Sequence, residues 1–80
     1  MEDVVTQIAD RVAGVAAEKR ASQSVVAGIV GLSRQAVNMR YNAKIPWGAS
    51  EVLRLARHWQ VPIERFFPAA DAGVPGERAA

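Results

Sequence analysis

The feature that most constrains the fold is the very short link Gly31-Leu32-Ser33, which follows an apolar segment. That segment carries apolar residues at helical spacing: Val25, Val26, Ile29 and Val30. Gly31 suits the left-handed position that ends many helices, and Ser33 is a favoured N-cap. We therefore expect two short helices joined by a tight turn, the first beginning after Ser22 and the second running over about 34–41.

The rest of the chain predicts three further helical segments and no strand. Apolar residues recur at helical spacing over about Val4 to Lys19. Pro46 breaks the chain, Gly48 can cap the next helix, and Glu51 suits the positive end of that helix. A last short turn is predicted over 62–67, since proline is a good first helical residue. The expected fold class is all-α, a small bundle of about five short helices.

Eighty residues make one domain at most, with a modest core. The core is expected to contain Ile8, Val12, Val26, Ile29, Val37, Val52, Leu55, Trp59 and Phe66. Trp47 lies between a proline and a glycine, and the sequence leaves open whether it is core, a DNA contact or a partner contact. Residues from 69 onward are small, polar or turn-forming. We expect a domain at 1–68 and a disordered tail at 69–80.

The composition argues against several classes of function. The chain has no cysteine, and His58 is its one histidine, so we expect no metal site. We find no glycine-rich phosphate loop, no paired carboxylates suited to a cleft and no nucleophile–base arrangement, so we expect no enzyme and no cofactor. The acidic start and the lack of a long apolar run predict a soluble, cytoplasmic protein with no membrane partner.

Charge is unevenly distributed, although the net charge is only +2. No Asp or Glu occurs over residues 19–50, where the basic residues are Lys19, Arg20, Arg34, Arg40 and Lys44. An acid-free surface favours contact with a polyanion, because carboxylates repel phosphate. The alternative is an ordinary solvated surface on which charges happen to cluster.

The second helix of the tight pair has a polar face, which carries Arg34, Gln35, Asn38 and Asn42. A helix that enters the major groove must protrude, so its outer side cannot hold large apolar groups. Arginine can bond guanine, and glutamine or asparagine can bond adenine. The pattern therefore favours a DNA-reading helix-turn-helix over an ordinary solvated face.

The spacing of these residues resembles the Cro and immunity-repressor (XRE-type) helix-turn-helix family. The matching residues are Ser22-Gln23, Ala27, Gly31 and Ser33-Arg34-Gln35-Ala36-Val37, followed by segments 52–57 and 59–67. The resemblance covers about residues 5–67 and implies a lambda-repressor-like domain. It also implies a sequence-specific regulator of transcription that binds double-stranded DNA, in the form of a phage or prophage Cro-like repressor in a bacterial or phage-infected cell.

The resemblance implies roles for individual residues. Base-reading residues would be Arg34, Gln35, Asn38 and Met39, the last by packing on a thymine methyl group. Phosphate-contacting residues would be Gln23, Ser33, Asn42 and Lys44, and the charge pattern adds Lys19, Arg20 and Arg40. Gln23 would bond a phosphate or brace the recognition helix.

The sequence departs from the family pattern at two positions. Arg40 stands where the family commonly has a bulky apolar residue. The sequence leaves open whether Arg40 is itself packed or turns to phosphate, in which case Tyr41 would supply the packing. Gln60 replaces the usual glycine before the last helix.

Alternative functions on the same fold are a DNA-binding antitoxin or an excisionase-like recombination accessory factor. A helical protein-interaction module is a third possibility. We expect double-stranded DNA as partner, and a monomer or weak homodimer that pairs on a palindromic operator.

Overall fold

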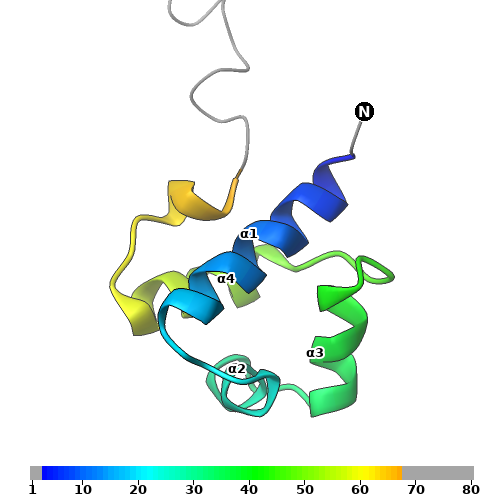
Figure 1. Ribbon diagram of the computed structural model, residues 1–80, viewed down its shortest axis with the longest axis horizontal. Helices are drawn as coiled ribbons and strands as arrows, with labels where there is room; N and C mark the ends of the chain where they lie inside the picture. Colours follow the sequence, from blue (N-terminus) through cyan, green and yellow to red (C-terminus); the bar gives the residue numbers. More distant parts are fainter. Residues whose placement is uncertain (1–2, 68–80) are drawn as a thin grey trace, which may run out of the picture.

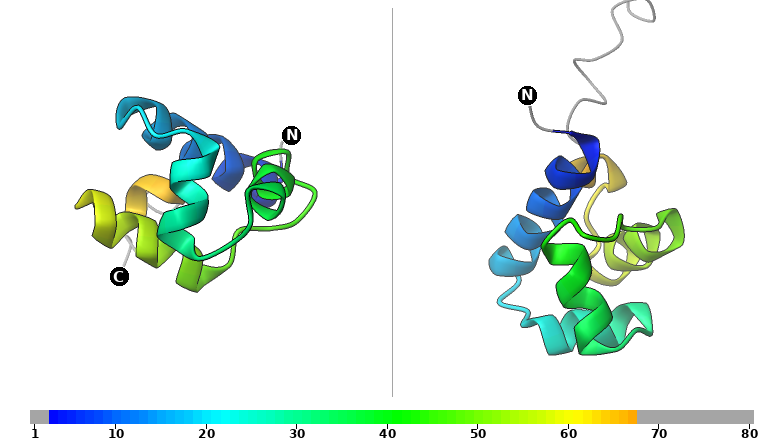
Figure 2. Two further views of the ribbon diagram at one scale, coloured as in Figure 1. Left: turned by 90° about the horizontal axis from the view of Figure 1, so that it is seen from below. Right: turned by 90° about the vertical axis from the view of Figure 1, so that its right-hand side faces the viewer.

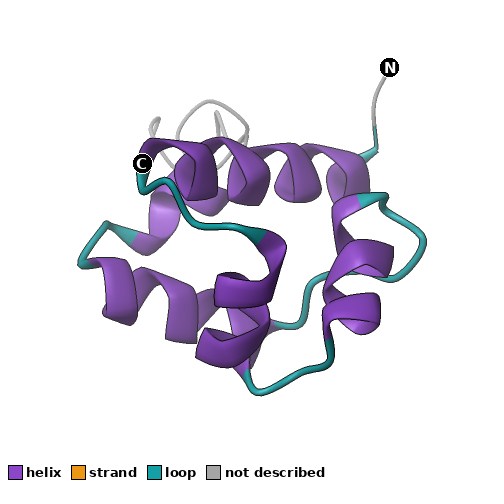
Figure 3. Cartoon of the chain, turned by 60° about the horizontal axis from the view of Figure 1, so that its bottom comes forward, coloured by secondary structure: helices purple, strands orange, loops and turns teal. Residues whose placement is uncertain are grey.

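The computed structural model describes residues 3–67, and helices are the only regular secondary structure in this range (Figures 1 and 3). The elements are α1 (Val4–Glu18), α2 (Gln23–Val30), α3 (Arg34–Tyr41), α4 (Ala49–Trp59) and the 3-10 helix η1 (Ile63–Phe66). The predicted all-α fold is confirmed, with a 3-10 turn as its fifth helix. The tail predicted at 69–80 lies outside the described residues.

The helices pack as a small bundle in which α2 contacts both α3 and α4, while α1 contacts α3 and η1. In Figure 1, α2 is seen end-on and α3 lies in the plane, whereas the left view of Figure 2 shows the reverse. The axes of α2 and α3 therefore cross steeply. This crossing lets α3 stand at one side of the molecule, with α2 packed beside its N-terminal end.

Serine caps set the starts of α2 and α3. The Oγ atoms of Ser22 and Ser33 accept the backbone N–H three residues on, at 3.2 and 3.1 Å. Between them, Gly31 ends α2 in the left-handed conformation, with φ of 74°. Each contact satisfies a backbone group that a helix end leaves unpaired. The tight turn predicted from the sequence is thus confirmed at both of its ends.

The core fills the space between the four α-helices and η1. Its largest fully buried side chains are Phe66, Leu55, Val12, Val26, Val37 and Val52, all of which the sequence predicts. Ile8, Ile29 and Trp59 are partly buried against this core. Small buried residues complete it, namely Ala9, Val15, Ala16, Ala27, Val30 and Ala56. Alanines at these positions let neighbouring helices approach closely.

Trp47 belongs to the core, which decides the question that the sequence leaves open. Its side chain is only 8% exposed, and its ring centroid lies 6.1 Å from that of Tyr41 at a tilt of 58°. Tilted aromatic pairs at this separation are favourable beyond the area that they bury. Tyr41 is itself partly buried against the core, as predicted. The aromatic pair anchors the loop between α3 and α4.

Candidate nucleic-acid interface

The helix α3 presents a polar face whose residues were predicted to read bases. Arg34, Gln35 and Asn38 are all exposed, and Met39 is half-buried. Val37, on the opposite side of the same helix, is fully buried. Burial of this one face holds α3 on the bundle and leaves its outer face exposed.

Three amide side chains form a hydrogen-bonded chain across this surface. Asn42 Nδ2 donates to the carbonyl oxygen of Asn38 at 3.0 Å and to Asn38 Oδ1 at 3.2 Å. Asn38 Nδ2 in turn donates to Gln23 Oε1, at the start of α2, at 3.2 Å. Gln23 therefore braces α3, one of its two expected roles. We call Gln23, Asn38 and Asn42 the amide chain.

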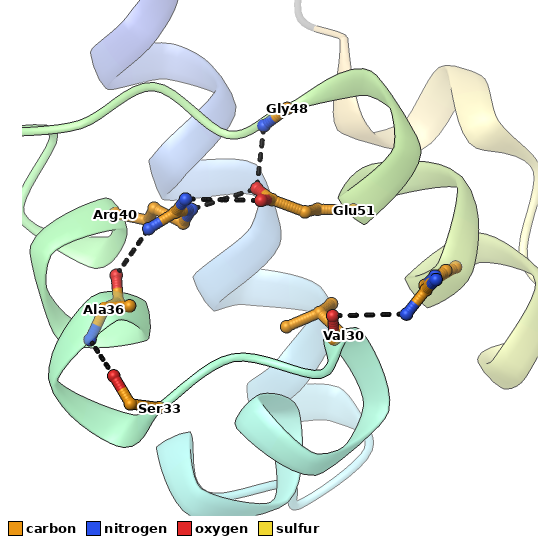
Figure 4. Close-up of polar contacts among 7 residues, drawn as sticks. Val30, Ser33, Ala36, Arg40, Gly48 and Glu51 are labelled. Carbon is orange, nitrogen blue, oxygen red and sulfur yellow. Dashed lines mark hydrogen bonds and ion pairs between the residues drawn. The ribbon is translucent and has the colours of Figure 1, made fainter.

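Arg40 lies within the fold, where its guanidinium is held by groups of the protein. Its Nε and Nη2 donate to the two carboxylate oxygens of Glu51 at 2.9 and 3.2 Å, and Nη1 donates to the Ala36 carbonyl at 3.0 Å (Figure 4). The two charged side chains are only 14% and 17% exposed. The carboxylate and the helix carbonyl thus accept hydrogen bonds from all three nitrogens of the guanidinium group. We therefore correct the expectation that Arg40 turns to phosphate and leave it out of the proposed interface.

The sequence carries a signal for this contact. Arg40 is three residues after the buried Val37, so the two share the inward face of α3. An inward arginine requires a partner, and Glu51 is the first acidic residue after the acid-free span. The local pattern around Glu51 predicts only that its carboxylate suits the positive end of α4.

Glu51 both pairs with Arg40 and stabilises the start of α4. Its Oε1 accepts the Gly48 backbone N–H at 2.8 Å, which is the glutamate half of a capping box at the start of α4, since glycine has no side chain to supply the other half (Figure 4). Burial raises the pKa of the Glu51 carboxyl, but hydrogen bonds from Arg40 and Gly48 and the charge of Arg40 outweigh burial. The net effect is a pKa below the ordinary value of 4.5, so the carboxylate is held ionised.

The other phosphate candidates are spread around α2 and α3. Ser33 is exposed at the start of α3, where its Oγ also serves as the cap. Lys44 is exposed in the loop that follows α3. Lys19 and Arg20 are exposed in the link between α1 and α2, before Gln23 and outside α3. The acid-free span thus covers α2, α3 and the links on either side of them.

Metal-ligand groups and membrane-spanning helices were both sought in residues 3–67. No group of three or more His, Asp or Glu in this range is arranged to hold a metal ion. None of the described helices combines the length and the apolar character needed to cross a membrane.

The tight pair α2–turn–α3, with its second helix exposed on one face, defines a helix-turn-helix domain. The chain belongs to the BetR domain family, whose model matches residues 2–79. Its fold is similar to that of the restriction-modification controller protein C.AhdI from Aeromonas hydrophila. That crystal structure aligns with a TM-score of 0.70 at 21% sequence identity, over 79% of this chain and 96% of C.AhdI. A search among curated proteins finds no match.

Proposed function

We propose that this protein is a transcriptional regulator that binds specific double-stranded DNA sites with α3 in the major groove. The observation that carries the proposal is the exposure of Arg34, Gln35 and Asn38 on one face of α3, the second helix of the helix-turn-helix. These side chains have the donors and acceptors that distinguish base pairs in the major groove. Met39 would contact a thymine methyl group at the edge of the same surface.

Phosphate contacts would position α3 before it reads bases. Ser33, Lys44, Lys19 and Arg20 supply hydroxyl, ammonium and guanidinium donors around the tight pair, and Gln23 supplies an amide donor. The charge balance favours the same partner, because no acidic residue interrupts residues 19–50. The first acidic residue beyond them, Glu51, is neutralised by Arg40. A polyanion would therefore meet little repulsion on this side of the molecule.

The form of regulator that we propose is a Cro-like repressor of phage or prophage type. The fold likeness to C.AhdI, a controller protein, favours a regulator over an antitoxin or a recombination accessory factor. The protein would be a monomer or a weak dimer in solution. Two molecules would bind the two halves of a palindromic operator, about one helical turn apart.

Selection of bound sites from a random duplex pool tests the proposal directly. We expect enrichment of a short motif, and of two inverted copies of it if two molecules bind together. The selected site should then be titrated with salt. Neutralising about four to six phosphates predicts a log–log slope of roughly −4 to −5 per bound molecule. A flat salt response would reject DNA as the partner, and salt-dependent binding without an enriched motif would reject sequence-specific reading.

A further inference from the structure

The helix α4 contacts both halves of the helix-turn-helix through two residues that lie about one turn apart. Glu51 accepts hydrogen bonds from Arg40, in the last turn of α3. Three residues further along α4, Arg54 Nη1 donates to the carbonyl oxygen of Val30, the last residue of α2, at 3.3 Å. Residues three apart are neighbours on one face of a helix. One face of α4 therefore holds α3 near its C-terminal end and α2 at its C-terminal end.

Arg54 supplies a cation at the end of α2, which has no charged residue of its own. The last carbonyls of a helix have no partner within it and carry the negative end of its dipole. The backbone N–H groups of Gly31 and Leu32 both donate to the carbonyl of Ala27, three residues before Val30. The guanidinium of Arg54 brings to the Val30 carbonyl both a donor and a positive charge.

The same guanidinium lies directly against the turn that joins α2 to α3. A Cβ on Gly31 would be only 3.3 Å from Arg54 Nη1, closer than ordinary van der Waals contact. Gly31 has the left-handed conformation in which the chain leaves α2, and the Ser33 cap of α3 follows two residues later. A shift of the turn would therefore pass directly to the first turn of α3.

From this arrangement we infer that Arg54 is a positioning residue for sequence recognition, which acts on α3 through the turn. The inference rests on the proposed function. Without Arg54, the pair of Arg40 and Glu51 would still hold the C-terminal end of α3, but its first turn, with Arg34 and Gln35, could shift about that point. Hydrogen bonds to base edges need exact placement, whereas attraction to phosphates acts on any sequence. Loss of Arg54 should therefore weaken specific binding and leave non-specific binding intact.

Binding of Arg54→Ala to the selected site and to an unrelated duplex of the same length tests the inference. We expect binding to the selected site to weaken about fivefold, the size of one typical hydrogen bond. Binding to the unrelated duplex should stay within about twofold of wild type, with an unchanged salt slope. Urea denaturation of each variant gives the folded fraction by which its affinity is corrected.

Arg57→Ala is the matched control, because Arg57 is exposed about one turn further along α4 and its replacement removes the same charge. This variant should bind both duplexes within about twofold of wild type. Arg54→Lys should recover at least half of the loss in binding free energy at the selected site, since its ammonium group restores a charged donor for Val30.

Three results on DNA would overturn the inference. Equal losses on both duplexes with a shallower salt slope would make Arg54 a direct phosphate contact. A loss at the selected site that Arg57→Ala matches would be an effect of net charge. A loss that the unfolded fraction explains, or that Arg54→Lys does not recover, would leave no positioning role.

The DNA-free protein gives a second readout. The carbonyl carbon resonance of Val30 and the amide resonances of Arg34 and Gln35 should move in Arg54→Ala but not in Arg57→Ala. Unchanged resonances would overturn the contact and its transmission to α3. If the wild-type protein binds no DNA while these resonances move, the proposed function fails and the contact between α4 and the turn stands.

Discussion

Arg40 in α3 and Glu51 in α4 are joined by two hydrogen bonds, of 2.9 and 3.2 Å. Glu51 also accepts the Gly48 N–H, so one carboxylate connects the last turn of α3 to the first turn of α4. Neither charged residue is needed at the proposed DNA surface. The position of α3 against α4 is therefore fixed by a contact outside the proposed DNA surface.

The first prediction concerns the stability that this contact supplies. Glu51→Gln keeps an acceptor for Gly48 but leaves the half-buried Arg40 without an opposite charge. We expect a loss of about 1–3 kcal/mol in the free energy of unfolding, as for other hydrogen bonds to charged groups. Urea denaturation measures it. Glu64→Gln is the matched control, because Glu64 is exposed, and it should change stability by less than about 0.5 kcal/mol.

The second prediction is the pH dependence of the same contact. The pKa of Glu51 is lowered in the folded state, so its stabilisation is complete above pH 4.5 and is lost as the pH falls through the lower folded value. The pKa of Asp3 is also lowered, by hydrogen bonds from Thr6, and that of Glu18 by its hydrogen bond with Arg65. Glu51→Gln should therefore make unfolding below pH 4.5 less steep without abolishing its pH dependence. An unchanged slope in that range would contradict the assignment.

The third prediction compares two residues that end helices in the left-handed conformation. Gly31 ends α2 at φ 74°, and a Cβ there would lie 3.3 Å from Arg54 Nη1, which donates to the Val30 carbonyl. Gln60 ends α4 at φ 55°, at a position where the XRE-type pattern usually has glycine. Gly31→Ala should cost about 1–2 kcal/mol, and Gln60→Gly should gain about 0.5 kcal/mol. Urea midpoints should move in opposite directions, and a shift in the same direction would refute the account.

The helix ends could be predicted from the sequence because their signals are local. Ser22, Gly31 and Ser33 each act on backbone groups within a few residues, so their meaning does not depend on the rest of the fold. The large apolar core residues could also be predicted, since helical spacing places them on one face of each helix.

The contacts of Arg40 and Trp47 are not local in this sense. Each depends on a partner from another element, Glu51 for the guanidinium and Tyr41 for the indole ring. The charge of Arg40 and the turn residues around Trp47 suggested exposure. The ion pair with Glu51 overrides this signal for Arg40, and packing of the α3–α4 loop against the core overrides it for Trp47.

The fourth prediction separates two roles of Ser33. Ser33→Ala removes the cap of α3, which should cost about 1 kcal/mol of stability. If Ser33 also contacts phosphate, DNA affinity should fall by more than the unfolded fraction explains. Ser22→Ala is the control, because it removes a matching cap from α2. Equal stability losses with a larger affinity loss for Ser33→Ala would support the phosphate contact, and equal affinities would exclude it.

The last prediction asks whether α3 reads sequence. Arg34 and Gln35 lie in its first turn, immediately after the Ser33 cap, and both are exposed. A helix that enters the groove by its N-terminus brings this turn nearest the base edges. Arg34→Ala or Gln35→Ala should therefore cost about 1–3 kcal/mol on the selected site and relax the preference at one base position. Repeating the site selection with each variant measures that change.

Lys44 gives the contrast, because it lies in the loop beyond α3 and carries a charge without base-pairing geometry. Lys44→Ala should weaken binding to selected and unrelated duplexes alike, and should lower the magnitude of the salt slope by about one. The two kinds of variant must differ if α3 is the reader. Arg34→Ala that weakens all sequences equally, as Lys44→Ala does, would mean that the acid-free span is a non-specific phosphate clamp.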